Sequence, residues 1–208
     1  AMTAFEPDWI VSMGGGSPID AAKAMWTFYE YPNVTFEELC IPFNFRTLRT
    51  KAKFCAIPST SGTATEVTAF SVITNYQTGV KYPLADFNIT PDVAIVDPEL
   101  AETMPAKLVA HTGMDALTHA VEAYLSRFYN TRKTRAQAKR AVVTIFSHLE
   151  RAYRDGASLP DRAAMLQASF DAGAAFTRAS VGNVHAIAHT LSGLYGTAHG
   201  LANAVLLP

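Results

Sequence analysis

The sequence has only two cysteines, Cys40 and Cys55. Two thiols are too few for a disulfide framework, and we interpret them as buried or incidental. Nowhere does the sequence contain a run of about 18 apolar residues, so no membrane-spanning helix is expected. The N-terminal residues lack the charged and apolar regions of a signal peptide. We therefore expect a cytoplasmic protein without a membrane partner.

The sequence also lacks an excess of charge of either sign. Charged residues make up 17% of the chain and the formal net charge is −1, so no global field favours nucleic acid or an anionic membrane. Apolar residues make up 49% of the 208 positions, which is typical of a globular protein with a sizeable core. The length allows one large domain or two modest ones.

A short apolar run over residues 7–13 leads into three glycines at 14–16, which is typical of a buried strand ending in a turn. A helix is predicted from Ser17, with Pro18 at its first position and Asp20 interpreted as a helix cap. Glycines and free N–H groups at a helix start favour an anion such as a pyrophosphate. Packing alone explains such a turn equally well.

The rest of the first half is predicted to contain further strands. Residues 54–57 and 92–96 are apolar runs, and residues 69–74 and 80–84 alternate like a hairpin. Between them, the loop 58–66 is rich in hydroxyl side chains, which could donate to a polar ligand. We favour the simpler interpretation of this loop as a solvent-exposed turn.

After Pro105 the apolar residues follow a helical period. Helices are predicted over residues 108–127, around 138–152, from Pro160, and from Gly182 onward. The fold class is therefore α/β followed by all-α.

The boundary is predicted at residue 104. Residues 1–104 would form a partial dinucleotide-binding α/β domain, because only one clear strand–helix unit is present. Residues 105–208 would form a helical metal-binding domain. We expect the chain to be a fragment of a longer protein.

Two helical segments supply candidate metal ligands. Asp115 and His119 are four positions apart and share one helix face. His185 and His199 lie in a second segment of small and apolar residues. One carboxylate with several imidazoles suits zinc or ferrous iron, and we hypothesise that these four residues hold one catalytic metal. Glu122 is either a partner that orients a ligand histidine or a plain surface charge.

Each ligand also has a simpler explanation. A lone buried histidine is more often a hydrogen-bonded structural residue than a ligand. An unpaired Asp115 buried beside imidazoles would cost several kcal/mol, roughly the penalty for a charge without a counter-ion, and a cation removes that penalty.

Several stretches, taken together and in this order, resemble the iron-containing (group III) alcohol dehydrogenase family. They are Gly14 to Asp20 (GGGSPID), Pro58 to Glu66, Gly113 to Glu122, and His185 to Asn203 with its HAIAH and HGLAN motifs. The resemblance covers nearly the whole chain and is nearest to the branch with NADPH-dependent butanol dehydrogenases and the alcohol dehydrogenase half of bifunctional aldehyde–alcohol dehydrogenases. It implies a dehydroquinate synthase-like architecture.

The resemblance also implies roles for individual residues. The metal, Fe²⁺ or Zn²⁺, would be held by Asp115, His119, His185 and His199, with His189 as a proton relay. The cofactor, NADP or NAD, would contact a larger set of residues from the first half, namely Gly14, Gly15, Gly16, Ser17, Ser59, Thr60, Thr63, Val72 and Lys81.

The implied activity is hydride transfer between NAD(P)H and a short-chain primary alcohol or aldehyde, by a homodimer or higher homo-oligomer. Three alternatives stay open. They are a zinc glycerol or polyol dehydrogenase, a dehydroquinate synthase-like NAD-dependent lyase, and an inactive truncated fragment that only binds metal.

Overall fold

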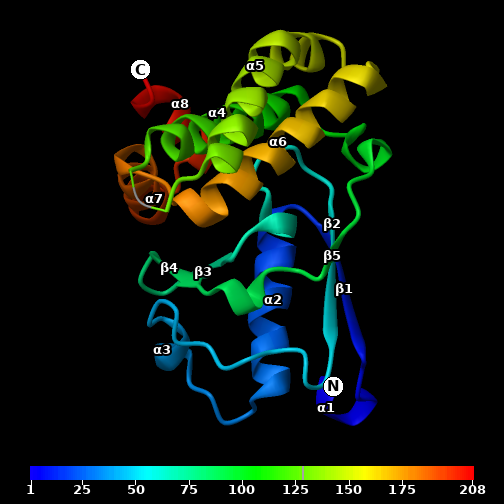
Figure 1. Ribbon diagram of the computed structural model, residues 1–208, viewed down its shortest axis with the longest axis vertical. Coiled ribbons are helices and arrows are strands. Elements are labelled where there is room, and N and C mark those ends of the chain that lie inside the picture. The colour runs from blue at the N-terminus through cyan, green and yellow to red at the C-terminus, as the bar shows by residue number, and fades with distance from the viewer. Residues whose placement is uncertain (128) are drawn as a thin grey trace.

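The structure is a computed structural model that describes residues 1–127 and 129–208 (Figure 1). An α/β part comes first in the chain and an all-helical part follows it, stacked along the long axis of the molecule. The predicted fold class is confirmed, whereas the division into two domains at residue 104 stays a prediction.

The α/β part is built on a parallel sheet in the order β1-β2-β5. Its strands are β1 (Trp9–Gly14), β2 (Lys53–Pro58) and the short β5 (Val93–Ala94). The strand predicted over 92–96 therefore has only two residues in the ladder. Helix α2 (Gly16–Glu30) packs against β1 and β2, so the glycine turn between β1 and α2 lies at the carboxyl end of the sheet.

Helix α2 starts two residues before the predicted position. Its N-cap is Gly15, not Ser17, and that cap makes no side-chain hydrogen bond. Gly14 has φ +152°, a conformation that favours glycine, and this lets β1 turn directly into the helix.

The predicted hairpin is confirmed. Strands β3 (Phe70–Asn75) and β4 (Val80–Ala85) pair antiparallel, and β3 packs against α2. The interpretation of Asp20 as a helix cap is wrong. Its carboxylate accepts a hydrogen bond from the backbone N–H of Val72 at 3.0 Å, which ties α2 to the hairpin.

A fully buried lysine strengthens this tie. The Nζ atom of Lys23 donates to the carbonyl oxygens of Thr68 at 2.6 Å and Phe70 at 2.9 Å. The same burial lowers the pKa of Lys23 and raises that of Asp20, while their mutual attraction opposes both shifts. Strand β3 is therefore fixed to α2 by buried polar contacts as well as by packing.

The helical part contains α4 (Ala106–Leu125), α5 (Arg132–Arg154), α6 (Leu159–Ala179), α7 (Asn183–Tyr195) and α8 (His199–Leu206). The segment from Gly182 onward, predicted as one helix, forms the two helices α7 and α8. The break between them is at Gly196, which ends α7 in a left-handed conformation with φ +66°. Short elements complete the chain: α1 (Met2–Phe5), α3 (Phe36–Leu39), and 3-10 turns at Thr65–Val67, Phe87–Ile89 and Pro98–Ala101.

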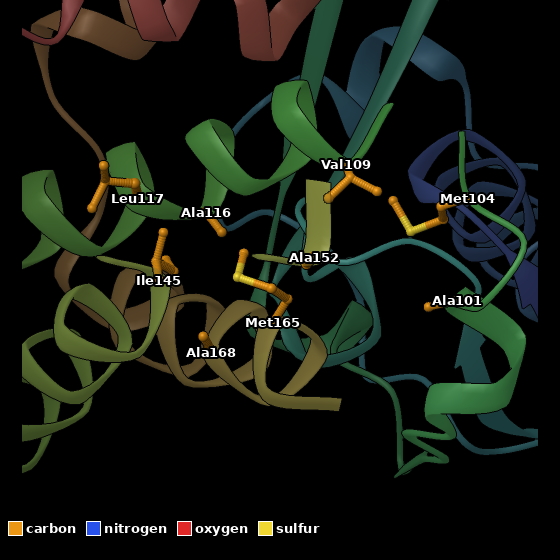
Figure 2. Close-up of a cluster of buried hydrophobic side chains, with 9 residues drawn as sticks. All are labelled: Ala101, Met104, Val109, Ala116, Leu117, Ile145, Ala152, Met165 and Ala168. Carbon is orange, nitrogen blue, oxygen red and sulfur yellow. The ribbon is translucent and has the colours of Figure 1, made fainter. Parts of the chain in front are cut away.

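Helices α4, α5 and α6 pack on one another around an apolar core (Figure 2). Met165 of α6 and Ile145 of α5 are 1% exposed and face Ala116 of α4. Gly113 allows close packing here, since a Cβ on it would lie 2.3 Å from Leu149. This core holds α4, and with it Asp115 and His119, in a fixed position.

The loop over residues 58–66 is not the solvent-exposed turn that we favoured. Ser61, Ala64 and Glu66 are buried, and a Cβ added to Gly173 of α6 would lie 2.3 Å from the Cβ of Ala64. Small side chains in this loop let it pass beneath α6, where the two parts of the molecule meet. Among the described residues, no helix is long and apolar enough to cross a membrane.

Candidate metal centre

Three of the four predicted ligands present their side-chain atoms to one another. Asp115 Oδ1 lies 3.4 Å from His199 Nε2 and 3.6 Å from His185 Nε2. Within the described residues, these three form the one group of histidine, cysteine and acidic side chains whose ligand atoms all lie within 4.8 Å. The group is drawn from α4, α7 and α8, so it depends on the helical packing described above.

Glu122 is buried and is not a surface charge. Its Oε2 atom lies 2.6 Å from His185 Nδ1, and its Oε1 atom accepts a hydrogen bond from the backbone N–H of Val184 at 2.8 Å. When the His185 ring is neutral, as it must be to bind a cation, a proton on Nδ1 shared with Glu122 leaves the free electron pair on Nε2. Nε2 is the atom that faces Asp115 and His199.

His119 lies beside the three-residue group but outside it. Its ring stacks on His185 with centroids 4.4 Å apart and, on its other side, on Phe176 at 4.2 Å. Phe176 in turn stacks on Phe70 of β3 at 5.8 Å. A column of four rings thus runs from the hairpin to the candidate metal centre. The role of His119 as a fourth ligand stays a prediction.

His189 lies one helical turn after His185 on α7. Its ring stacks on that of His199, with centroids 4.6 Å apart, and is 6.1 Å from that of His185. Burial, with the neighbouring His199, lowers the pKa of His189 to about 4, so the ring is neutral near pH 7.

The charges at this centre are strongly coupled. Burial alone would raise the pKa of Asp115, but His119 and the contact with His185 hold it well below its usual range. Burial alone would lower the pKa of His185, yet hydrogen bonds to Asp115 and Glu122 raise it to about 9. Burial also lowers the pKa of His119 to about 3 and that of His199. A buried anionic carboxylate beside mostly neutral imidazoles is a donor set that suits a divalent cation.

A cavity of about 520 Å³ joins this centre to the glycine turn. It is lined by all five residues of the centre, Asp115, His119, His185, His189 and His199. At its other end it is lined by Gly16 and Ser17. The cavity therefore runs along the junction of the α/β and helical parts.

The predicted cofactor residues divide into two groups. Five line the cavity: Gly16, Ser17, Thr63, Val72 and Lys81. The other four, Gly14, Gly15, Ser59 and Thr60, are not among its lining residues but support the turn behind it. The Ser59 N–H donates to Gly14 O at 2.8 Å, and a Cβ on Gly15 would lie 3.3 Å from Thr60.

Lys81 connects the two parts of the molecule. Its Nζ donates to Ser192 Oγ on α7 at 2.8 Å, and burial lowers its pKa. Close by, a Cβ on Gly193 would lie 2.6 Å from the carbonyl oxygen of Gly79, so both positions leave space only for glycine. The hairpin thereby closes one side of the cavity against α7.

Sequence reasoning missed several residues of the site. Phe176, Thr68 and Phe70 line the cavity without having been predicted, because a single apolar or hydroxyl residue carries no spacing signal. The resemblance includes Asn203 only as the last residue of the HGLAN motif. Its position four residues after His199, on the same helix face, was a signal that could have found it.

The chain matches known families and structures over its whole length. A profile for "Iron-containing alcohol dehydrogenase" matches residues 1–98, and one for "Fe-containing alcohol dehydrogenase family, C-terminal" matches residues 109–208.

The curated relatives are longer proteins. The chain is 58% identical to the NADPH-dependent butanol dehydrogenase of Clostridium saccharobutylicum, over 100% of the chain and 53% of that protein. It is 44% identical to the bifunctional aldehyde-alcohol dehydrogenase of Escherichia coli K12, over 98% of the chain and 24% of that protein. The chain thus spans about half the length of the first and a quarter of the second.

Solved structures agree with these matches. A crystal structure of 1,3-propanediol oxidoreductase superposes with a TM-score of 0.92 at 41% identity, covering 100% of this chain and 53% of that one. An iron-containing alcohol dehydrogenase from Thermococcus thioreducens gives a TM-score of 0.88 at 38% identity, covering 98% and 53%. A sulfoacetaldehyde reductase from Bifidobacterium kashiwanohense, solved with NAD⁺, gives 0.88 at 32% identity, covering 97% and 53%.

Proposed function

Because the chain belongs to the iron-containing alcohol dehydrogenase family, we propose that it carries the metal centre of a metal-dependent, NAD(P)-linked alcohol dehydrogenase. The reaction is hydride transfer between NAD(P)H and a short-chain primary alcohol or aldehyde. The longer relatives support this substrate class by their names, which include a butanol dehydrogenase and a 1-propanol dehydrogenase.

The single observation that supports the proposal most is the spacing of the ligand atoms. Ligands at about 2.1 Å from a tetrahedral cation are about 3.4 Å from each other. The distances from Asp115 Oδ1 to the two Nε2 atoms, 3.4 and 3.6 Å, match that spacing. Asp115, His185 and His199 would hold Fe²⁺ or Zn²⁺, with His119 as the fourth ligand.

The bound cation would supply Lewis acidity toward the substrate oxygen. Gly16 and Ser17 bind the cofactor pyrophosphate with backbone N–H groups at the start of α2. Lys81, held by Ser192, lines the same cavity and would contribute positive charge beside the cofactor. The residues that line the cavity would hold NAD(P)H, and the nicotinamide would supply or accept the hydride.

His189 is the candidate proton carrier. It is neutral near pH 7, lines the cavity, and its Nδ1 atom is buried with no hydrogen-bond partner among the described residues. A neutral imidazole accepts the proton that an alcohol releases and passes it toward solvent.

Metal analysis tests the proposal. The chain, purified anaerobically and loaded with Fe²⁺ or Zn²⁺, is expected to hold about one ion, and His199→Ala is expected to lose most of it. His148→Ala is the matched control, since this histidine contacts Asp161 of α6 and is neither in the ligand group nor in the cavity lining. A parent chain that holds no ion after loading would contradict the metal centre.

A substrate panel tests the reaction. Oxidation of NADPH or NADH with butanal and propanal is expected to exceed activity with glycerol. Preference for glycerol with zinc would favour a polyol dehydrogenase, and the absence of net NAD(P)H turnover would favour the lyase or the inactive fragment. The homodimeric or higher state and the cytoplasmic location belong to the same proposal, and sedimentation of the chain tests the former.

A further inference from the structure

Asn203 occupies a position at the candidate metal centre that no ligand role explains. It lies on α8 one turn after His199, and its side chain is completely buried. Its Nδ2 atom lies 2.6 Å from Asp115 Oδ1 and 3.3 Å from the Nε2 atoms of both His185 and His199. A single amide nitrogen therefore contacts all three atoms that would bind the cation, namely Asp115 Oδ1 and the Nε2 atoms of His185 and His199.

An amide nitrogen is a donor only, and its neighbours determine what it can do. The carboxylate of Asp115 accepts the hydrogen bond from Asn203 Nδ2 over 2.6 Å. The two Nε2 atoms lie farther from the amide nitrogen, at 3.3 Å, and an imidazole nitrogen that binds a cation has no second lone pair with which to accept a hydrogen bond. The hydrogen bond from Asn203 therefore orients the carboxylate of Asp115, and the amide nitrogen supplies no further ligand atom.

We propose that Asn203 is a positioning residue for the metal centre, which holds the carboxylate of Asp115 turned toward His185 and His199. Without this donor, the carboxylate loses the hydrogen bond of 2.6 Å that holds Oδ1 in place. The cation would then have to order that carboxylate on binding. The inference rests on the proposed metal centre and adds to it the residue that fixes its one anionic ligand.

The amide oxygen of Asn203 also supports the positioning role. Asn203 Oδ1 is buried and has no hydrogen-bond partner among the described residues. A buried amide oxygen without a partner costs about 1–3 kcal/mol, and a residue retained only for packing would be apolar at such a position. The amide is explained by what its nitrogen does for Asp115.

The test compares the metal affinity of two variants with that of the parent. Co²⁺ is the probe, measured by visible absorption and by competition with a chromophoric chelator. Asn203→Leu keeps the branched shape of the side chain at a larger volume, Asn203→Ala leaves space, and both remove the donor. Both are expected to bind one Co²⁺ per chain with an affinity about 10–100-fold lower than the parent, as is usual when a residue that orients a ligand is removed.

Asn130→Ala is the matched control. Its amide nitrogen donates to the carbonyl oxygens of Ala123 and Tyr124 at the end of α4, away from the ligands. This variant is expected to lower the free energy of unfolding and to leave the Co²⁺ affinity unchanged. A Leu variant with the parent's affinity would overturn the inference, as would a folded variant that binds no Co²⁺, since Asn203 would then be a ligand.

The outcomes separate this inference from the proposed function. If the parent binds no Co²⁺, the metal centre itself is refuted. If the parent binds one Co²⁺ and both variants bind it equally well, the metal centre stands and only the positioning role of Asn203 is refuted. If Asn203→Leu does not fold, the Ala variant carries the comparison.

Discussion

The carboxylate of Glu122 accepts a hydrogen bond from His185 over 2.6 Å and a second from the backbone N–H of Val184 over 2.8 Å. The first bond fixes the tautomer of His185, and the second fixes the start of α7 on α4. Gly182 makes this approach possible, because a Cβ there would lie 2.8 Å from Glu122 Oε1. One side chain thus orients a predicted ligand and the helix that carries it.

Glu122→Gln is predicted to lower metal affinity about 10–100-fold. A glutamine has one acceptor oxygen and one donor group, so one of the two N–H donors, of His185 or Val184, loses its partner. Chelator competition with Zn²⁺ measures the change. Glu122→Asp, which keeps both acceptors on a shorter side chain, is expected to lose less, and equal affinity in the Gln variant and the parent would contradict the role.

Gly200→Ala is predicted to displace α8. A Cβ at this position would lie 1.9 Å from the carbonyl oxygen of His111 on α4, and backbone atoms there cannot rotate away. Since α8 carries His199, we expect both a loss of several kcal/mol in unfolding free energy, roughly as for other overpacked sites, and a loss of bound metal.

Gly196→Ala is the control for that experiment. Gly196 has φ +66° and no atom within 4 Å of an added Cβ, so the substitution costs only about 1 kcal/mol of backbone strain. The variant is expected to keep its metal. Urea unfolding measures the stability of both variants, and metal analysis measures their metal content. Equal losses in Gly200→Ala and Gly196→Ala would contradict the packing argument.

The free energy of unfolding is predicted to depend on pH because of the buried carboxyl group of Glu66. It is 2% exposed, and burial raises its pKa to about 7, against smaller opposing effects of a backbone hydrogen bond and Lys23. Because the folded pKa lies above the ordinary value, its contribution is fully present below about pH 4.5 and is lost as the pH rises through about 7.

Glu66→Gln is predicted to remove this dependence. Relative to the variant, the parent is expected to lose unfolding free energy on the order of 3 kcal/mol as the pH rises over that range. Urea unfolding at several pH values measures it. Glu150→Gln, at an exposed ion pair with Arg154, serves as the control with little change expected. A Glu66→Gln difference that is constant with pH would contradict the prediction.

Gly16→Val is predicted to block the cofactor end of the cavity. Even a Cβ on Gly16 would lie 2.9 Å from Thr63, and a larger side chain would fill the space where the helix start faces the cavity. NADPH binding, followed by fluorescence, is expected to weaken at least about tenfold, a loss of about 1.4 kcal/mol or more. Metal content should stay at the parent level, and unchanged NADPH affinity would count against a pyrophosphate site here.

Much of the helical part could be predicted from the sequence. Helix α5 has an apolar stripe at regular helical spacing, and Pro160 marks the first turn of α6. The break between α7 and α8 was less clear, because Gly196 acts only through its left-handed backbone conformation. Strand β5 is short because only two of its residues have a partner on β2, which depends on sheet register and not on local composition.

The polar residues were harder to predict than the helices. Asp20 has the sequence signal of a helix cap, but its partner is Val72, 52 positions away. The hydroxyl loop 58–66 has the composition of an exposed turn, yet it is buried because Gly173 lets α6 approach Ala64. In both cases the deciding contact is made with a distant segment, which local patterns do not report.

The hydrogen bond from Asn203 to Asp115 spans 88 positions. Contacts with such separation form late in folding, since the intervening chain must first be ordered. Helix α8 has only eight residues, so it is not stable in isolation and forms when it docks on α4. Docking of α8 on α4 is therefore expected late in folding, and amide hydrogen exchange should be faster in α8 than in α4, α5 or α6.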